Sequence, residues 1–358
     1  MTRGTVWQTG PLGPMLGGLL REGRAEGAFP EGAAAVWHGG RRAGEAVLAG
    51  DHGDVHPQAL RWDLASLTKP RVVGTLAMQA VSAGALDLDA PMSPDLPPHV
   101  TARALLGHRA GLPPFFTWWR ALPPRCRAGS REARSALEAL TRHAALESRP
   151  GAPACYSDIG FMLLYFELER RLGALRGRFQ GFGGVSPPRA PERFVACGPC
   201  PARGRVVQGE VHDPQAWAAG GAAGHAGLFA TARAVTAWGA GLVALARGAP
   251  TPSHGPLAGV SGDVVRAFWA APAQPDGSTW RLAWDSPSAH GSSAGETVAP
   301  DAVGHLGFTG TSVWLEPARD LTVVLLTNRV ALGERAQPRL RGFRPRFHDA
   351  VREAVARG

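Results

Sequence analysis

The sequence predicts a mixed α/β (α+β) fold, in which an antiparallel sheet built from both ends of the chain is flanked by helices and joined to an inserted helical region. Two observations support this prediction. Strand-like runs lie near both ends of the 358 residues, whereas the middle of the chain carries apolar residues at helical spacing. Strands and helices segregated in this way are typical of an α+β architecture.

The elements follow in a simple order. Strand character is found at residues 32–38, 43–49, 303–309, 312–316 and 321–327. Helical character is found at residues 64–84, 101–107, 130–146, 159–172, 228–246 and 347–356. Gly39 and Gly40 supply a turn that makes the first two strands a hairpin. The stretches 177–209 and 286–299 are predicted to be surface loops because they are rich in small and turn-forming residues.

Composition narrows the class of protein. The formal net charge is +9, but the arginines are scattered and form no basic run, so nucleic acid is not a predicted partner. A basic surface can still steer an anionic substrate. No apolar stretch approaches the roughly 20 residues that span a bilayer, and no signal segment is visible. Four cysteines are too few for a disulfide scaffold, so we expect a soluble cytoplasmic protein with reduced thiols. The sequence makes no prediction of the oligomeric state.

Ser66 and Lys69 are the first candidate catalytic pair, at the start of the predicted helix 64–84. Residues three apart share a helix face, so the lysine amine can reach the serine hydroxyl. Of 38 basic side chains, 37 are arginine, which does not deprotonate in proteins, and only Lys69 can serve as a base. Burial and the helix N-terminus are expected to lower the pKa of Lys69. The alternative is a surface lysine that follows a serine by chance.

Tyr156 is the candidate acid and base, and it precedes Ser157, Asp158 and the predicted helix 159–172. A phenol whose pKa is lowered beside the ammonium of Lys69 can pass a proton to the leaving group and take one from the attacking water. The alternative is that Ser157 or Asp158 caps the helix while Tyr156 packs at its boundary.

His305 and Gly307 begin a strand near the C-terminus, where glycine lets a substrate approach the backbone closely. The backbone amide of Phe308, together with that of Ser66, can form an oxyanion hole. We therefore expect these residues, together with Asp158, to form the oxyanion hole and bind substrate. The alternative for His305 is a structural histidine held by hydrogen bonds.

These three elements, in this order, resemble the β-lactamase-related serine hydrolases, a group that includes class C β-lactamases, D-alanyl-D-alanine carboxypeptidases, D-aminopeptidases and esterases. The resemblance extends over nearly the whole chain. It is carried by residues 26–30, 62–70, 84–91, 105–112, 224–231 and 304–311. The nucleophile segment 62–70 and the strand segment 304–311 are the most specific of these.

The resemblance implies that residues 1–358 form a single β-lactamase/transpeptidase-like catalytic unit. It implies a sheet subdomain of approximately residues 1–65 and 280–358, a helical subdomain of approximately residues 85–280, and an active site between the two. It implies no metal and no organic cofactor.

By resemblance, Ser66 is the acylated nucleophile, Lys69 its partner and Tyr156 the general acid and base. Two departures distinguish this chain. Asp158 stands where the family commonly has asparagine, and His305 opens a His-Leu-Gly where true β-lactamases usually have Lys-Thr-Gly. Histidine pairs with a substrate carboxylate less readily than lysine at neutral pH, so the departures favour esters or small peptides over β-lactams.

Other residues suggest weaker candidates. Cys197 and Cys200 form a C-x-x-C that could serve redox chemistry or metal binding, but its flanks lack the expected context, so we expect an incidental pair in a loop. His212 and His225 could belong to a triad or a metal site, and pocket lining is the favoured interpretation. Trp118 is a further candidate for the pocket wall.

The sequence therefore predicts a serine hydrolase that cleaves an ester, amide or small peptide through an acyl-enzyme on Ser66. The alternative is a catalytically weak or silent relative that binds peptide or cell-wall fragments, as the departures at Asp158 and His305 allow.

Overall fold

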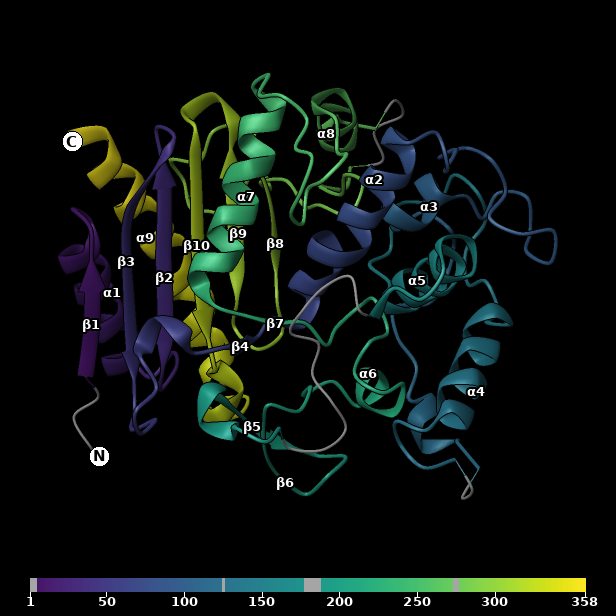
Figure 1. Ribbon diagram of the computed structural model, residues 1–358, viewed down its shortest axis with the longest axis horizontal. Coiled ribbons are helices and arrows are strands. Elements are labelled where there is room, and N and C mark those ends of the chain that lie inside the picture. Colours follow the sequence, from purple (N-terminus) through teal and green to yellow (C-terminus); the bar gives the residue numbers. More distant parts are fainter. Residues whose placement is uncertain (1–4, 124–125, 177–187, 273–276) are drawn as a thin grey trace.

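A six-stranded antiparallel sheet forms one half of the molecule in the computed structural model, which describes residues 5–123, 126–176, 188–272 and 277–358 (Figure 1). Its strands are β1 (Thr5–Thr9), β2 (Gly32–His38), β3 (Arg41–Ala49), β8 (Val303–Leu306), β9 (Ser312–Glu316) and β10 (Leu321–Thr327), in the order β1-β3-β2-β10-β9-β8. Because β2 pairs with β10, the two ends of the chain meet at the centre of the sheet. The predicted sheet is thereby confirmed.

Helices cover both faces of this sheet and form a second body beside it (Figure 1). They are α1 (Gly13–Ala25), α2 (Thr75–Ser82), α3 (Ala102–Leu106), α4 (Arg131–Arg142), α5 (Asp158–Leu172), α6 (Pro214–Ala218), α7 (Ala232–Ala246), α8 (Gly262–Trp269) and α9 (Ala336–Arg357). Two short strand pairs lie between the bodies: β4 (Trp62–Asp63) with β7 (Phe229–Ala230), and β5 (Ala196–Cys200) with β6 (Arg205–Gln208). None of the described helices combines the length and apolar character that crossing a membrane would need.

The sheet is buried on both faces because its central strands carry apolar residues that point to either face in turn. On β2, Ala34 and Val36 pack in the cluster that includes the apolar side chains of α1 and α9. Ala33 and Ala35 point the other way and join the larger core, which contains α7 and the helical body. One continuous core therefore extends from the sheet into the helical half and fixes the position of the cleft between them.

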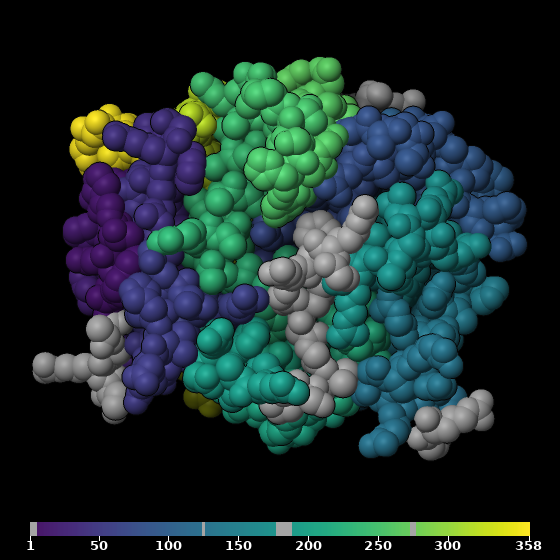
Figure 2. Space-filling view, viewed as in Figure 1, coloured from purple at the N-terminus to yellow at the C-terminus, as the bar shows by residue number. Residues whose placement is uncertain are grey.

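The two bodies draw on different parts of the chain. In the space-filling view, N-terminal residues (purple) lie against C-terminal residues (yellow) at one end, and the blue and teal residues form the other end (Figure 2). The segment 85–280 also contains α7, which packs on the sheet against β10. The exact subdomain limits stay a prediction.

The predicted helix 64–84 is three pieces in the structure. A 3-10 turn at Ala65–Leu67 is followed by a π-helical turn at Lys69–Gly74 and then by α2. A π-helical turn is rare and occurs mostly at functional sites. The prediction of one regular helix is therefore wrong in detail, and the irregular part carries both candidate catalytic residues.

Two further predictions need correction, and two elements were not predicted. The segment 177–209 contains the β5–β6 hairpin, although residues 177–187 lie outside the described residues. The last helix begins at Ala336 rather than at residue 347, because its first proline lies in the opening turn and buried Leu340 and Phe343 anchor it to the sheet. The N-terminal β1 and α1 were not predicted, since glycine and proline interrupt their pattern.

Candidate active site

A strained turn presents Ser66 at the edge of the cleft. Ala65, the residue before it, has φ 47°, a left-handed conformation that costs a residue with a side chain roughly 1–3 kcal/mol. Asp63 holds this turn, because its Oδ1 accepts a hydrogen bond from the Ala65 amide at 2.8 Å. The Thr309 hydroxyl donates to the Asp63 carbonyl at 2.8 Å and ties the turn to the end of β8. The nucleophile candidate is thus fixed from both bodies of the molecule.

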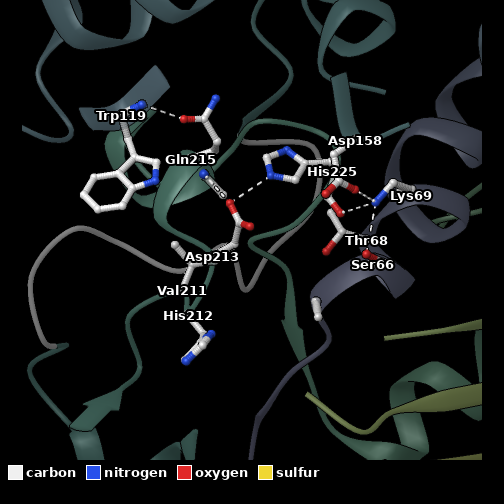
Figure 3. Close-up of polar contacts among 12 residues, drawn as sticks. Ser66, Thr68, Lys69, Trp119, Asp158, Val211, His212, Asp213, Gln215 and His225 are labelled. Atoms are coloured by element: carbon white, nitrogen blue, oxygen red, sulfur yellow. Dashed lines mark hydrogen bonds and ion pairs between the residues drawn. The ribbon is translucent and has the colours of Figure 1, made fainter. Parts of the chain in front are cut away.

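The Ser66 hydroxyl lies between two proton-bearing groups (Figure 3 shows the lysine side). Lys69 Nζ is 3.0 Å from Ser66 Oγ, and the Tyr156 hydroxyl donates to the same oxygen at 2.8 Å. Lys69 is fully buried and donates its other two hydrogen bonds to Asp158 Oδ1 at 2.6 Å and to the His225 carbonyl at 3.2 Å. An ammonium has three donors, and all three are satisfied here.

The pKa values of Lys69 and Tyr156 are shifted in the direction opposite to that predicted from the sequence. Burial would lower the pKa of Lys69, but the Asp158 carboxylate and the Tyr156 phenol outweigh it, so the pKa is raised. Burial raises the pKa of the Tyr156 phenol, and the nearby Lys69 charge offsets this only in part. The expected lowering of both pKa values is therefore wrong. The resting site holds an ammonium paired with Asp158 and a neutral phenol.

The end of β8 approaches Ser66 closely because residue 307 is glycine. A side chain at Gly307 would come within 2.0 Å of Thr311 Oγ1 and 2.6 Å of the Leu64 carbonyl. The next residue, Phe308, lines the cavity together with Ser66, and its side chain is 64% exposed. The two residues whose amides were predicted to form an oxyanion hole therefore border one cavity.

His305 is neutral in the structure. Burial and the charge of Lys69 lower its pKa to about 3. Its Nδ1 donates to the Leu306 carbonyl at 2.8 Å, which leaves Nε2 as an acceptor with no hydrogen-bond partner in the described part of the chain. His305 can therefore accept a hydrogen bond from a substrate, but it cannot pair with a carboxylate.

The rings of His108 and Trp280 hold Tyr156 in place, and neither residue was predicted from the sequence. The ring of Tyr156 lies 4.8 Å from that of His108 and 5.3 Å from that of Trp280. His108 Nδ1 also accepts from the Ser157 amide at 3.0 Å, and burial holds the pKa of His108 well below its usual value. A neutral histidine thus fixes the backbone and the ring of the neighbouring tyrosine. No sequence signal connected His108 or Trp280 with residue 156.

A cavity of about 700 Å³ opens on this group. Of the predicted site residues, those on its wall are Ser66, Tyr156, Asp158, His212, His225, His305, Gly307 and Phe308. Lys69 lies beneath the wall. Trp118 does not line the cavity, because its ring stacks on Phe116 at 4.8 Å, and its neighbour Trp119 takes that position.

The remaining sequence candidates do not form a triad or a redox pair in the structure. His212 Nε2 lies 2.9 Å from the Pro199 carbonyl, whereas His225 Nε2 lies 2.9 Å from Asp213, so the two histidines have separate partners. Cys197 and Cys200 are free and buried in β5, so the expectation that they lie in a loop is wrong. The described residues contain no cluster of three or more histidine, cysteine, aspartate or glutamate side chains suited to a metal.

Two buried arginines belong to the site, although the sequence did not single them out. Arg344 lines the cavity, and Arg329 lies beside it, as the effect of its charge on the pKa of Arg344 shows. Burial and that second charge lower the pKa of Arg344 to about 10. Each guanidinium donates one hydrogen bond to a backbone carbonyl, Arg344 to Thr311 and Arg329 to Phe308. The Nε atom of each has no hydrogen-bond partner among the described residues. With 37 arginines in the chain, nothing in the sequence singles out these two.

Comparisons with known proteins agree with this architecture. The Beta-lactamase family model matches residues 16–179 and 185–342. An N-acetylmuramyl-L-alanine amidase of Bacillus subtilis (strain 168) is 28% identical over 312 residues, which cover 75% of this chain and 68% of the relative. A putative D-alanyl-D-alanine carboxypeptidase of Escherichia coli (strain K12) is 25% identical, with 75% and 69% covered.

A solved structure shows the same fold. A penicillin-binding protein homologue from Caulobacter crescentus superposes with a TM-score of 0.66 at 17% identity and covers 94% of this chain and 98% of its own. The fold and the cleft define a β-lactamase/transpeptidase-like hydrolase. The chain belongs to the Beta-lactamase family.

Proposed function

We propose that this protein is a serine hydrolase that cleaves an amide or ester bond through an acyl-enzyme on Ser66. The observation that carries the proposal is the position of Ser66 Oγ, at 3.0 Å from Lys69 Nζ and 2.8 Å from Tyr156 Oη. A nucleophile needs a base within hydrogen-bond reach, and the base in turn needs a group that orients it. Asp158 and the His225 carbonyl orient Lys69 in this way.

The reaction proceeds in two steps. Lys69, once neutral, takes the proton of Ser66 Oγ as that oxygen attacks the carbonyl carbon, and the amides of Ser66 and Phe308 stabilise the resulting oxyanion. Tyr156 gives its proton to the leaving amine or alkoxide as the bond breaks, and Lys69 restores it. Water then attacks the acyl-enzyme and gives a proton to the pair Lys69 and Tyr156. The pair returns this proton to Ser66 Oγ as the acid product leaves.

The arginines suggest the substrate class. By their names, the relatives described above are an N-acetylmuramyl-L-alanine amidase and a putative D-alanyl-D-alanine carboxypeptidase. We infer that this chain takes a small amide or peptide that carries a carboxylate, which pairs with Arg344 on the cavity wall. His305, being neutral, instead accepts a hydrogen bond from a substrate N–H. Esters are the alternative substrate class.

Arg344→Gln is expected to raise KM about 10- to 100-fold for a peptide with a free C-terminal carboxylate, because a hydrogen bond to a charged group contributes about 1.5–3 kcal/mol. The same peptide with an amidated C-terminus should show little change. Steady-state kinetics on this matched substrate pair provide the measurement. Equal changes for both peptides would contradict carboxylate recognition by Arg344.

Asp158→Asn is expected to shift the acidic limb of the kcat/KM profile about 1–3 pH units lower. The Asp158 carboxylate raises the pKa of Lys69, so the neutral base exists only at alkaline pH in the wild type. Without that carboxylate, burial dominates and the pKa of Lys69 falls, so more neutral amine is present near pH 7. The profile of both proteins, measured from pH 5 to 11, checks this, and an unmoved limb would exclude Lys69 as the titrating base.

A panel of esters and amides, including D-amino acid amides and muropeptides, tests the proposed function as a whole. We expect turnover by the wild type and none by Ser66→Ala, with both proteins folded by circular dichroism. Binding of the same compounds without turnover by the wild type would favour the silent, peptide-binding alternative. Turnover that survives in Ser66→Ala would refute a serine mechanism.

A further inference from the structure

A second charge pair lies directly behind the catalytic group. His225 is 1% exposed, and its Nε2 lies 2.9 Å from Asp213 Oδ1. Its backbone carbonyl is one of the three acceptors of the Lys69 ammonium, at 3.2 Å. In the close-up, the His225 ring lies between Asp213 on one side and Asp158 with Lys69 on the other (Figure 3). The same residue therefore touches Lys69 through its backbone and Asp213 through its ring.

The contact between His225 and Asp213 favours the charged form of both side chains. Burial would lower the pKa of His225, but the Asp213 carboxylate outweighs it and the pKa is raised. Burial raises the pKa of Asp213, yet His225 outweighs this and brings it to about 2. Asp158 further favours the imidazolium, and Lys69 opposes it. Acidic and basic side chains therefore alternate, from Asp213 through His225 and Asp158 to Lys69.

The helix-capping role of Asp213 does not account for this arrangement. Asp213 Oδ1 accepts from the Ala216 amide at 2.7 Å and caps α6, a function that asparagine or serine serves equally well. Capping does not require a buried histidine, and the other ring nitrogen of His225, Nδ1, has no hydrogen-bond partner in the described part of the chain. A buried charge with an unpartnered donor costs free energy, and the capping of α6 does not require that cost.

We propose that the Asp213–His225 pair is a positioning and charge-balancing pair for the active site, which aligns Lys69 on Ser66 and counters the pull of Asp158 on the Lys69 proton. The His225 carbonyl directs the amine towards the nucleophile. The imidazolium, a positive charge near Lys69, opposes protonation of the amine and makes the neutral base accessible at a lower pH. Asp213 keeps the imidazolium charged. The proposal rests on the proposed function, since it assigns these residues to the same reaction.

The sign of the effect provides the test. In His225→Gln the backbone carbonyl stays, but the positive charge is lost and Asp213 remains, so the pKa of Lys69 rises. The acidic limb of kcat/KM should therefore move up by about one pH unit, the opposite direction to Asp158→Asn. In Asp213→Asn, asparagine preserves the α6 cap, and the limb should move in the same upward direction by a smaller amount. KM should change little in either variant.

The matched control is His52→Gln. His52 forms another histidine–carboxylate contact, at 3.1 Å from Glu31, away from the residues that line the catalytic cavity. Replacing His52 should leave the pH profile of kcat/KM unchanged. The protonation of His225 is measured independently by ¹H–¹⁵N NMR of the imidazole nitrogens, with His225→Gln used for the assignment, and a midpoint above that of free histidine is expected.

The outcomes separate the two claims. An unmoved or downward-shifted limb in folded Asp213→Asn and His225→Gln, or a neutral His225 at pH 6, would overturn this inference while leaving the serine mechanism intact. Activity retained in Ser66→Ala would instead overturn the proposed function. Should His225→Gln fail to fold, the limb of Asp213→Asn still decides the inference.

Discussion

Lys69→Arg is expected to reduce kcat by at least about 10³-fold on any substrate that the wild type turns over. Arginine keeps the positive charge that faces Asp158, so the ion pair survives, but it does not lose a proton in proteins and cannot serve as the base. The substitution therefore separates charge from basicity at one buried position. The measurement is kcat for wild type and variant over pH 6 to 11, with thermal melts to show that both are folded.

The pH dependence makes this prediction specific. Raising the pH should restore activity in a variant that retains a titratable amine, but not in Lys69→Arg. Since arginine is larger than lysine and the site is fully buried, Lys69→Met combined with Asp158→Asn provides a second, uncharged variant. Turnover within tenfold of the wild type in either folded variant would remove Lys69 from the mechanism.

Tyr156→Phe is expected to lower kcat for amide substrates by about 10²- to 10⁴-fold, the usual contribution of a general acid. Phenylalanine keeps the ring that packs against His108 and Trp280, so the fold and KM should change little. Only the hydroxyl that donates to Ser66 Oγ at 2.8 Å is removed.

The choice of leaving group tests the role of that hydroxyl. The p-nitrophenolate of a p-nitrophenyl ester can leave without being protonated, whereas the amine of an amide substrate cannot. The variant should therefore lose much more activity on the amide than on the ester. Equal losses on both would assign Tyr156 to nucleophile activation rather than to protonation of the leaving group. No loss on either would exclude it from the reaction.

The sequence predicted the parts of the fold and site that depend on local spacing. The continuous apolar runs in β2 and β10 match a sheet that is buried on both faces. The contact between Ser66 and Lys69 follows from their separation of three residues, even though the local backbone is a 3-10 turn and a π-helical turn rather than a regular helix. The single lysine in a chain rich in arginine was visible in the composition alone.

The features that were missed depend on contacts between distant segments. The direction of the Lys69 pKa shift is set by Asp158, which α5 brings to 2.6 Å from the amine. Arg344 enters the cavity from α9, a helix whose prolines concealed its true start. His225 was predicted to line the pocket, but only the fold places it and its partner Asp213 behind Lys69.

Covalent labelling identifies the nucleophile directly. The purified protein is incubated with a fluorophosphonate at pH 9, digested, and its peptides are mapped by mass spectrometry, beside Ser66→Ala and Lys69→Arg. We predict one adduct, on the peptide that contains Ser66, absent from Ser66→Ala and formed far more slowly in Lys69→Arg. Folded wild-type protein that carries no adduct, or carries it on another residue, would contradict the assignment of Ser66 as the nucleophile.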